Sequence, residues 1–259
     1  MQAVLFSLAS YKIPRKTKRW AGSAGAALLL MLAFGGGAQA AEPQCTFPAK
    51  ILDMGHPLHR TWAAISTGRP LSLVALGSSS TAGAGASTVD ASYPTRLRAR
   101  LSSLFGHPVI VVNRGRNGDR VGDMLLRLPE VISEHPDAVI WQLGTNALLT
   151  GLGREDFGSL FSRGMRKIRD TGADLIIVDP QFAPKVLAHR DAEDFVRLID
   201  HAAIQAGVAL FRRFELMRFW HEQHLGFRQF LSPDQLHMND WSYDCLADAL
   251  AHAIIRSPG

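Results

Sequence analysis

Five short apolar segments, each separated from the next by a stretch of helical pattern, restrict the fold of this chain more than any other feature. Each segment is almost entirely apolar rather than alternating and is bounded by Gly, Pro, Asp or Asn, which is typical of strands covered on both faces. The segments are 71–76, 109–112, 138–143, 175–178 and 208–211, and helical patterns lie near 93–105, 120–134, 155–171, 191–206 and 240–256. This alternation predicts βαβ units and an α/β fold, a three-layer α/β/α sandwich around a central parallel sheet of about five strands.

The 259 residues are enough for one sizeable domain or two small ones. Since neither an internal repeat nor a second composition regime appears, we expect one domain over 71–259, preceded by a loose arm over 41–70. In an open parallel sheet, ligands bind outside the carboxyl ends of the strands. The polar residues that follow the first four predicted strands should therefore converge there. They are Gly77 to Thr81, Asn113 to Gly118, Gly144 to Asn146 and Asp179 to Gln181.

The first 40 residues read as an export signal rather than as part of the fold. Five basic residues precede the apolar stretch 21–34, and Ala38-Gln39-Ala40 matches an A-x-A cleavage site. The sequence therefore predicts a signal peptide over 1–40, cleaved after Ala40, and a periplasmic or secreted protein without a stable membrane span after cleavage. An uncleaved membrane anchor is the alternative, because the apolar stretch is close in length to a membrane span.

Export changes the meaning of two features of the composition. The first 40 residues hold five basic and no acidic residues, so basic and acidic residues are equal in number in the remainder. The basic balance of the full chain is therefore no argument for a nucleic-acid partner. The two cysteines, Cys45 and Cys245, lie near the ends of the remaining chain. In an oxidising compartment such a pair can form a disulfide between the arm and the last helix; two unpaired thiols are the alternative.

Three consecutive serines follow the first predicted strand, in the stretch VALGSSSTAGAGAS at 74–87. A flexible connector has the same Gly, Ser and Ala composition. A serine hydroxyl becomes a strong nucleophile only when a neighbouring base takes its proton, and a histidine base needs a partner that holds its tautomer. Asp234 and His237, three residues apart in DQLH, are the candidate pair. Taken alone, they are better explained as a turn aspartate and as a surface histidine, one of the ten histidines in the chain.

Two further loops offer hydrogen-bond donors for the charge that develops on a tetrahedral intermediate. The sequence NRGRNG at 113–118 offers backbone N–H groups in a loop where glycine permits close approach. The sequence GTN at 144–146 places a side-chain amide directly after a predicted strand. Either segment could be only a turn, since glycine and asparagine are common after strands. The segment DPQFAP at 179–184 either lines a substrate cleft or is a plain proline-rich turn.

Taken together, four of these blocks resemble the SGNH (GDSL-type) serine hydrolases, from about residue 71 to the C-terminus. Residues 77–81 resemble the family's G-D-S-x-S/T block, 113–118 its second block, 144–146 its G-x-N block and 234–237 its D-x-x-H block. The resemblance implies a flavodoxin-like SGNH hydrolase fold. It also implies a catalytic triad of Ser79, His237 and Asp234. The implied oxyanion hole consists of the backbone N–H groups of Ser79 and Gly118 and the side-chain amide of Asn146.

The match departs from the family pattern at three positions. Ser78 replaces the aspartate of the first block, Ala147 replaces the aspartate that often follows the third, and Met238 replaces the proline after the histidine. None of these changes removes a group that acyl transfer needs. The three consecutive serines leave Ser78 and Ser80 as alternative nucleophiles.

The resemblance implies an exported serine esterase that hydrolyses carboxylic esters through an acyl-enzyme, with no metal and no organic cofactor. The expected substrate is an O-acylated carbohydrate or a small ester with a short acyl group, because no amphipathic lid of large apolar residues is evident. The aromatic residues of 212–230, which include Phe214, Phe219, Trp220 and Phe227, either pack in the core or receive an acyl chain. A lipid esterase, thioesterase or acyltransferase with the same site is an alternative, and a non-catalytic envelope binding module is another. The oligomeric state is left open.

Overall fold

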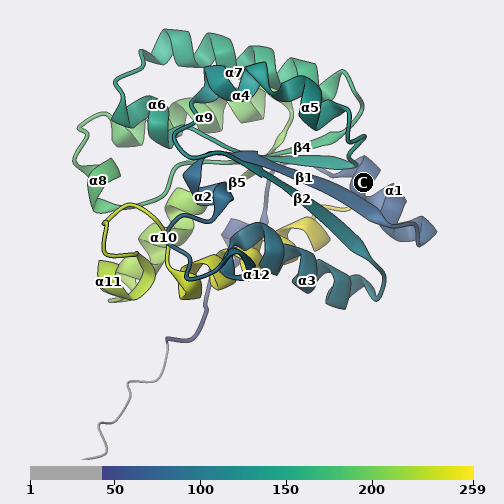
Figure 1. Ribbon diagram of the computed structural model, residues 1–259, viewed down its shortest axis with the longest axis horizontal. Coiled ribbons are helices and arrows are strands. Elements are labelled where there is room, and N and C mark those ends of the chain that lie inside the picture. The colour runs from purple at the N-terminus through teal and green to yellow at the C-terminus, as the bar shows by residue number, and fades with distance from the viewer. Residues whose placement is uncertain (1–42) are drawn as a thin grey trace, which may run out of the picture. The chain divides into compact units, whose positions relative to one another are not determined.

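The structure is a computed structural model, and it describes residues 43–259. In these residues a parallel sheet lies between two layers of helices (Figure 1). The strands are β1 (Leu71–Gly77), β2 (Val109–Gly115), β3 (Ala138–Gln142), β4 (Asp174–Val178) and β5 (Ala209–Phe211). They form one five-stranded sheet in the order β2-β1-β3-β4-β5, and every pair is parallel. The predicted α/β sandwich with about five strands is confirmed.

Helices cover both faces of the sheet (Figure 1). Figure 1 shows α4 (Val121–Leu126), α5 (Leu128–Ile132), α7 (Arg154–Arg169) and α9 (Ala192–Ala206) on one face, and α3 (Tyr93–Phe105) and α12 (Asp240–Ile255) on the other. The remaining elements are η1 (Ala49–Leu52), α1 (His59–Thr67), α2 (Ser79–Ala82), η2 (Val89–Ala91), α6 (Thr145–Leu149), α8 (Pro184–Leu187), α10 (Arg213–Glu222) and α11 (Phe227–Phe230). The single helix predicted over 120–134 is wrong. It is divided at Arg127, because Pro129 lacks the N–H that would continue the hydrogen-bond pattern.

The edge strand β2 is longer than the sequence predicts. It continues to Gly115 and pairs Asn113 with Ala75 and Gly115 with Gly77 of β1. Because β2 lies at the edge of the sheet, its residues are only partly covered, and Ile110 is 50% exposed. An apolar run alone therefore underestimates its length. The extension brings the beginning of the 113–118 loop alongside the carboxyl end of β1.

The segment before the sheet is less loose than expected. Its described part contains η1 and α1, and it buries Ile51, Met54 and Leu58 in the core. Cys45 forms a disulfide with Cys245 of α12, so the predicted link between arm and last helix is confirmed. The predicted signal peptide and its cleavage site lie outside the described residues. Over residues 43–259, no helix has the length and apolar character needed to cross a bilayer.

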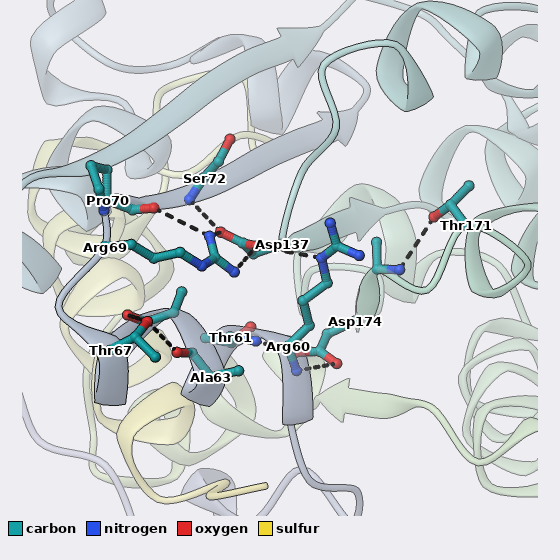
Figure 2. A network of polar contacts seen from close by, with 12 residues as sticks. Arg60, Thr61, Ala63, Thr67, Arg69, Pro70, Ser72, Asp137, Thr171 and Asp174 are labelled. Atoms are coloured by element: carbon teal, nitrogen blue, oxygen red, sulfur yellow. Dashed lines mark hydrogen bonds and ion pairs between the residues drawn. The ribbon is translucent and has the colours of Figure 1, made fainter.

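A carboxylate ties together the amino ends of the strands. Asp137, directly before β3, accepts hydrogen bonds from both terminal guanidinium nitrogens of Arg69, at 2.8 and 2.6 Å, and from the backbone N–H of Ser72 at 3.0 Å (Figure 2). Arg60 Nε donates to it at 3.4 Å. Asp174, directly at the start of β4, accepts from backbone N–H groups at the beginning of α1. These bonds fix α1 and the neighbouring strands at the end of the sheet opposite the loops described next.

Candidate active site

The three serines lie at the carboxyl end of β1, where the chain turns into the short helix α2. Ser78 and Ser80 are buried, at 3% and 2% exposure, whereas Ser79 is partly exposed. The backbone N–H and the hydroxyl of Ser78 both donate to Gln142 Oε1 at 3.0 Å, and Thr81 Oγ1 donates to the same oxygen at 3.2 Å. One buried amide oxygen therefore holds the turn. It also leaves Ser79 as the serine that faces outward.

Gln142 is a site residue that the sequence interpretation missed. It is the last residue of β3 and is fully buried. A single polar residue inside the apolar run AVIWQL was the available signal. Because a buried amide without partners costs free energy, a glutamine at such a position indicates a specific set of donors nearby.

The end of β2 supports α2 from the other side. Asn113 Nδ2 donates to Thr81 O at 2.8 Å, while Asn113 Oδ1 accepts from the N–H of Gly115 at 2.9 Å. A Cβ atom on Gly115 would lie 2.2 Å from Ala82 N, so only glycine lets β2 approach α2 this closely. The first three residues of NRGRNG thus contribute to placing Ser79.

The hairpin 231–238 brings an imidazole and a carboxylate to Ser79. His237 Nε2 lies 2.7 Å from Ser79 Oγ, and His237 Nδ1 lies 2.5 Å from Asp234 Oδ2. Since a carboxylate only accepts hydrogen bonds, Nδ1 carries the proton, and the Ser79 hydroxyl donates to Nε2. In this arrangement the imidazole can take the serine proton while the carboxylate stabilises the positive charge that results.

The carboxylate is itself held by its own hairpin. Asp234 Oδ1 accepts from Ser232 Oγ at 2.7 Å and from the backbone N–H groups of Leu236 and His237 at 2.9 Å. Partial burial raises the pKa of Asp234, but these bonds and the bond from His237 lower it well below its ordinary value. Asp234 is therefore ionised at neutral pH. Gln235 adopts a positive φ of 59°, which closes the turn between the two residues.

Gly118 lies in the loop after β2 and Asn146 lies in the first turn of α6, next to that loop. Asn146 Nδ2 donates one hydrogen to Asp119 O at 2.9 Å, which leaves its second amide hydrogen for another acceptor. Arg127, which is 6% exposed, holds the side chain of Asp119 through an ion pair of 2.7 Å. In the described part of the chain, no acceptor pairs with the N–H groups of Ser79 or Gly118. All three donors that the sequence predicts thus remain able to bind an added oxygen.

The polar residues after β4, at 179–181, are buried. Asp179 and Gln181 are 2% and 1% exposed, and Arg213 beside them is fully buried. These three side chains therefore lie beneath the surface at the carboxyl end of the sheet and do not line an open cleft. Burial raises the pKa of Asp179 to about 7, although the backbone N–H of Phe214 and the positive charge of Arg213 act against that rise. Arg213 was not predicted, since nothing in the pattern RRFELM indicates a buried guanidinium.

The aromatic residues of 212–230 are mostly part of the core. Phe214 and Trp220 are 1% and 0% exposed, so both of them pack in the core and neither is free to receive an acyl chain. Phe227 is partly exposed and stacks on His221 with ring centroids 4.5 Å apart. Phe227 also lines a groove of about 530 Å³ along the hairpin 231–238. The other residues of the groove are Gly85, Arg228, Leu231, Ser232, Pro233, Gln235 and Asn239.

Comparisons with known proteins give a consistent result. The family model described as the non-GDSL lipase-like family matches residues 44–258. An arylesterase from Vibrio mimicus is 27% identical over 188 residues, which cover 71% of this chain and 88% of that protein. The crystal structure of a lipase/acylhydrolase from Enterococcus faecalis has a TM-score of 0.62 and 21% identity, and covers 71% of this chain and 95% of its own.

Two further solved structures are similar. TesA has a TM-score of 0.61 and 25% identity, over 71% of this chain and 97% of its own. A two-domain esterase active on acetylated mannans has a TM-score of 0.67 and 19% identity, over 78% of this chain and 54% of its own. The last likeness shows the shared fold.

Proposed function

The chain belongs to the non-GDSL lipase-like family, an SGNH-type esterase family, and is an ester-hydrolysing enzyme; from this premise we propose that it acts through a triad of Ser79, His237 and Asp234. The resemblance predicted from the sequence is confirmed at the level of the family and of the enzyme class. The observation that carries the proposed triad is the 2.7 Å contact between Ser79 Oγ and His237 Nε2. The 2.5 Å bond from His237 to Asp234 supports it.

In the proposed mechanism, His237 Nε2 takes the hydroxyl proton as Ser79 Oγ attacks the ester carbonyl. The oxyanion of the tetrahedral intermediate accepts hydrogen bonds from the N–H groups of Ser79 and Gly118 and from the amide of Asn146. Collapse of the intermediate breaks the bond to the alcohol, which leaves with the proton held by His237. Water then attacks the acyl-enzyme and gives a proton to His237. The bond between the acyl carbon and Ser79 Oγ breaks, His237 returns the proton to Ser79 Oγ, and the acid is released. Asp234 keeps Nδ1 protonated throughout.

The proposed substrate is an O-acylated carbohydrate or a small ester with a short acyl group. The burial of Phe214 and Trp220 in the core supports a short acyl group, because these two aromatic side chains offer no surface to an extended chain. The structural neighbour active on acetylated mannans supports an acetylated carbohydrate as a first substrate to try. The Cys45–Cys245 disulfide supports export, because such bonds persist in oxidising compartments.

The decisive experiment is labelling of the purified protein with a fluorophosphonate, followed by mass mapping of the modified peptide. We expect modification of Ser79 in the wild-type protein and none in Ser79→Ala or His237→Ala. A folded wild-type protein that is not labelled would argue for a non-catalytic binding module. Modification of Ser78 or Ser80 instead would show that the modified serine, and not Ser79, is the nucleophile.

The nature of the acceptor and of the acyl group is tested on the same preparation. Hydrolysis of acetyl, butanoyl and octanoyl esters of one phenol should give the highest kcat/KM for acetyl. Product analysis with an added sugar alcohol distinguishes a hydrolase, which gives free acid, from an acyltransferase, which gives a new ester.

A further inference from the structure

At the carboxyl end of the sheet lies a buried cluster that consists of Thr145, Asp179, Gln181 and Arg213, none of them more than 3% exposed. Gln181 is at its centre. Its Oε1 accepts from Thr145 Oγ1 at 2.8 Å and from Arg213 Nη2 at 2.9 Å, and its Nε2 donates to Leu236 O at 3.3 Å. One amide thus joins segments that lie 36 and 55 residues away in the chain.

Both partner segments carry proposed catalytic groups. Thr145 directly precedes Asn146, and Leu236 directly precedes His237. Gln181 therefore bonds to a residue next to an oxyanion donor and to a residue next to the base. The bond to Thr145 is buried, and the bond to Leu236 O is partly buried.

The orientation of the Gln181 amide is determined by Arg213. The guanidinium is fixed because its Nε donates to the backbone O of Asp179 at 2.9 Å. Arg213 Nη2 has only hydrogens to offer, so the amide oxygen must face it and the Nε2 group must face the opposite direction. Leu236 O lies in that direction. A flipped amide would set two donors against each other in a buried place, which is strongly unfavourable.

The ends of the hairpin, Leu231 and Met238, are buried in the core, but few hydrogen bonds connect its turn to the rest of the fold. The side-chain oxygens of Asp234 bind only within residues 232–237 of the described chain, so they shape the hairpin without placing it on the sheet. The bond from Gln181 Nε2 connects the hairpin to the loop after β4, and a weaker one from Lys185 N to Gln235 O, at 3.4 Å, connects it to α8.

We propose that Gln181 is a positioning residue that holds the first turn of α6, which carries Asn146, and the hairpin that carries His237 at the separation needed for catalysis. The proposal rests on the proposed function, since it assumes that Asn146 and His237 act on the ester. Reacting groups must keep their geometry within a fraction of an ångström, and a displacement of about 1 Å can cost about a hundredfold in rate. Loss of either bond should therefore lower kcat, while groups that bind the ground state remain in place.

The two bonds can be cut separately. Gln181→Glu keeps an oxygen toward Thr145 and Arg213 but has no donor for Leu236 O. Thr145→Val keeps the shape of the side chain and removes the bond to Gln181 Oε1. We expect each variant to lower kcat about tenfold to a hundredfold with KM within about twofold of wild type.

Two matched variants serve as controls. Thr145→Ser restores the hydroxyl and should bring kcat back to within about twofold of wild type. Thr61→Val makes the same change at a buried threonine near the amino end of the sheet, where Thr61 is 1% exposed and far from Gln181 in the fold. Its kcat should equal that of wild type. Thermal unfolding midpoints are measured for all variants.

The outcomes separate this inference from the proposed function. Fluorophosphonate labelling of the wild type at Ser79 is done first, and its failure would overturn the proposed function together with the inference. With labelling established, the inference is overturned by a kcat within about threefold of wild type in both Gln181→Glu and Thr145→Val. A rise in KM at constant kcat, or a lower unfolding midpoint with unchanged kcat, would likewise overturn it, because each indicates a binding or purely structural role. Thr145→Val also keeps the test valid if Gln181→Glu does not fold.

Discussion

The two ends of the sheet each carry a carboxylate with several hydrogen bonds, but the bonds come from different parts of the chain. At the amino end, Asp137 takes its donors from Arg60 in α1 and from Arg69 and Ser72 near the start of β1, all distant from it in the chain (Figure 2). At the carboxyl end, Asp234 takes all of its donors from its own hairpin. The side chains are 3% and 41% exposed, respectively. The first carboxylate connects elements of the fold, and the second orients one imidazole.

The electrostatic consequence is similar at both ends. Burial raises the pKa of Asp137, but hydrogen bonds from Arg69, Ser72 and Arg60 lower it below the ordinary value, as those of Asp234 do for that group. A lowered pKa therefore does not distinguish a site from a structural connection. The distinguishing feature is the partner: His237 has a second nitrogen that reaches a serine, whereas the guanidinium groups at Asp137 lead to no reactive group.

Isosteric removal of the two charges should separate the two roles. Asp234→Asn lets His237 adopt the other tautomer, with a proton on Nε2, so kcat should fall about ten-thousandfold while the free energy of unfolding changes little. Asp137→Asn removes the partner of Arg69 and should lower the free energy of unfolding by about 2 kcal/mol, with kcat within about threefold. Ester hydrolysis rates and urea unfolding on the same samples measure both effects. A large loss of kcat in Asp137→Asn would show that the two ends of the sheet are coupled and that Asp137 is not purely structural.

Removal of an oxyanion donor tests the carboxyl end in a second way. Asn146→Ala should lower kcat by about a hundredfold to a thousandfold, as expected for one missing donor, with little change in unfolding. Asn146→Asp, which replaces the donor with an acceptor, should be at least as inactive. A loss of less than about tenfold in Asn146→Ala would remove Asn146 from this role.

The residues of the proposed site at the carboxyl end of the sheet could be named from the sequence, but the buried residues that hold them in place could not. Short apolar runs predict buried strands, and the residues that follow them share one edge of the sheet, so the serine and asparagine segments could be expected to meet there. The proposed roles of Ser79, Asn146 and His237 came from the resemblance to the SGNH hydrolases. Gln142 and Arg213 could not be assigned roles, because the partners that make a buried polar residue tolerable lie far away in the chain. Ser78 and Gln142, for example, are 64 residues apart. No local pattern records such a pair.

The disulfide between Cys45 and Cys245 lies at neither end of the sheet and tests a purely structural connection. It joins residues 200 positions apart, so its loss frees a long loop in the unfolded chain. Cys45→Ser combined with Cys245→Ser should lower the free energy of unfolding by about 3 kcal/mol and leave kcat within about twofold. This would place the disulfide with Asp137 as a purely structural connection. A fall in kcat at full stability would instead mean that α12 positions the hairpin that precedes it.

Asp179 is a third carboxylate, and it differs from both Asp137 and Asp234. It lies at the carboxyl end of the sheet, as Asp234 does, but it is buried, as Asp137 is. Within the described residues its carboxylate accepts one hydrogen bond, from the N–H of Phe214 at 2.9 Å, so burial dominates and raises its pKa to about 7 from 3.8. The folded protein then keeps a proton that the unfolded chain has lost between these two values. Its contribution to stability is full below about pH 4 and disappears as the pH rises through about 7.

The free energy of unfolding should therefore fall between pH 5 and 7 by up to about 1.4 kcal/mol per pH unit on account of Asp179, and by nothing further above about pH 8. Asp179→Asn keeps an oxygen for the N–H of Phe214 but cannot ionise. The difference between the wild-type and variant slopes isolates this one group, because other titrating residues contribute equally to both. Urea unfolding at pH 5, 6, 7 and 8 measures the slopes. Equal slopes would mean that Asp179 is ionised in the folded protein because the nearby charge of Arg213 outweighs burial. Asp179 and Asp137 would then both be buried carboxylates stabilised by a guanidinium group.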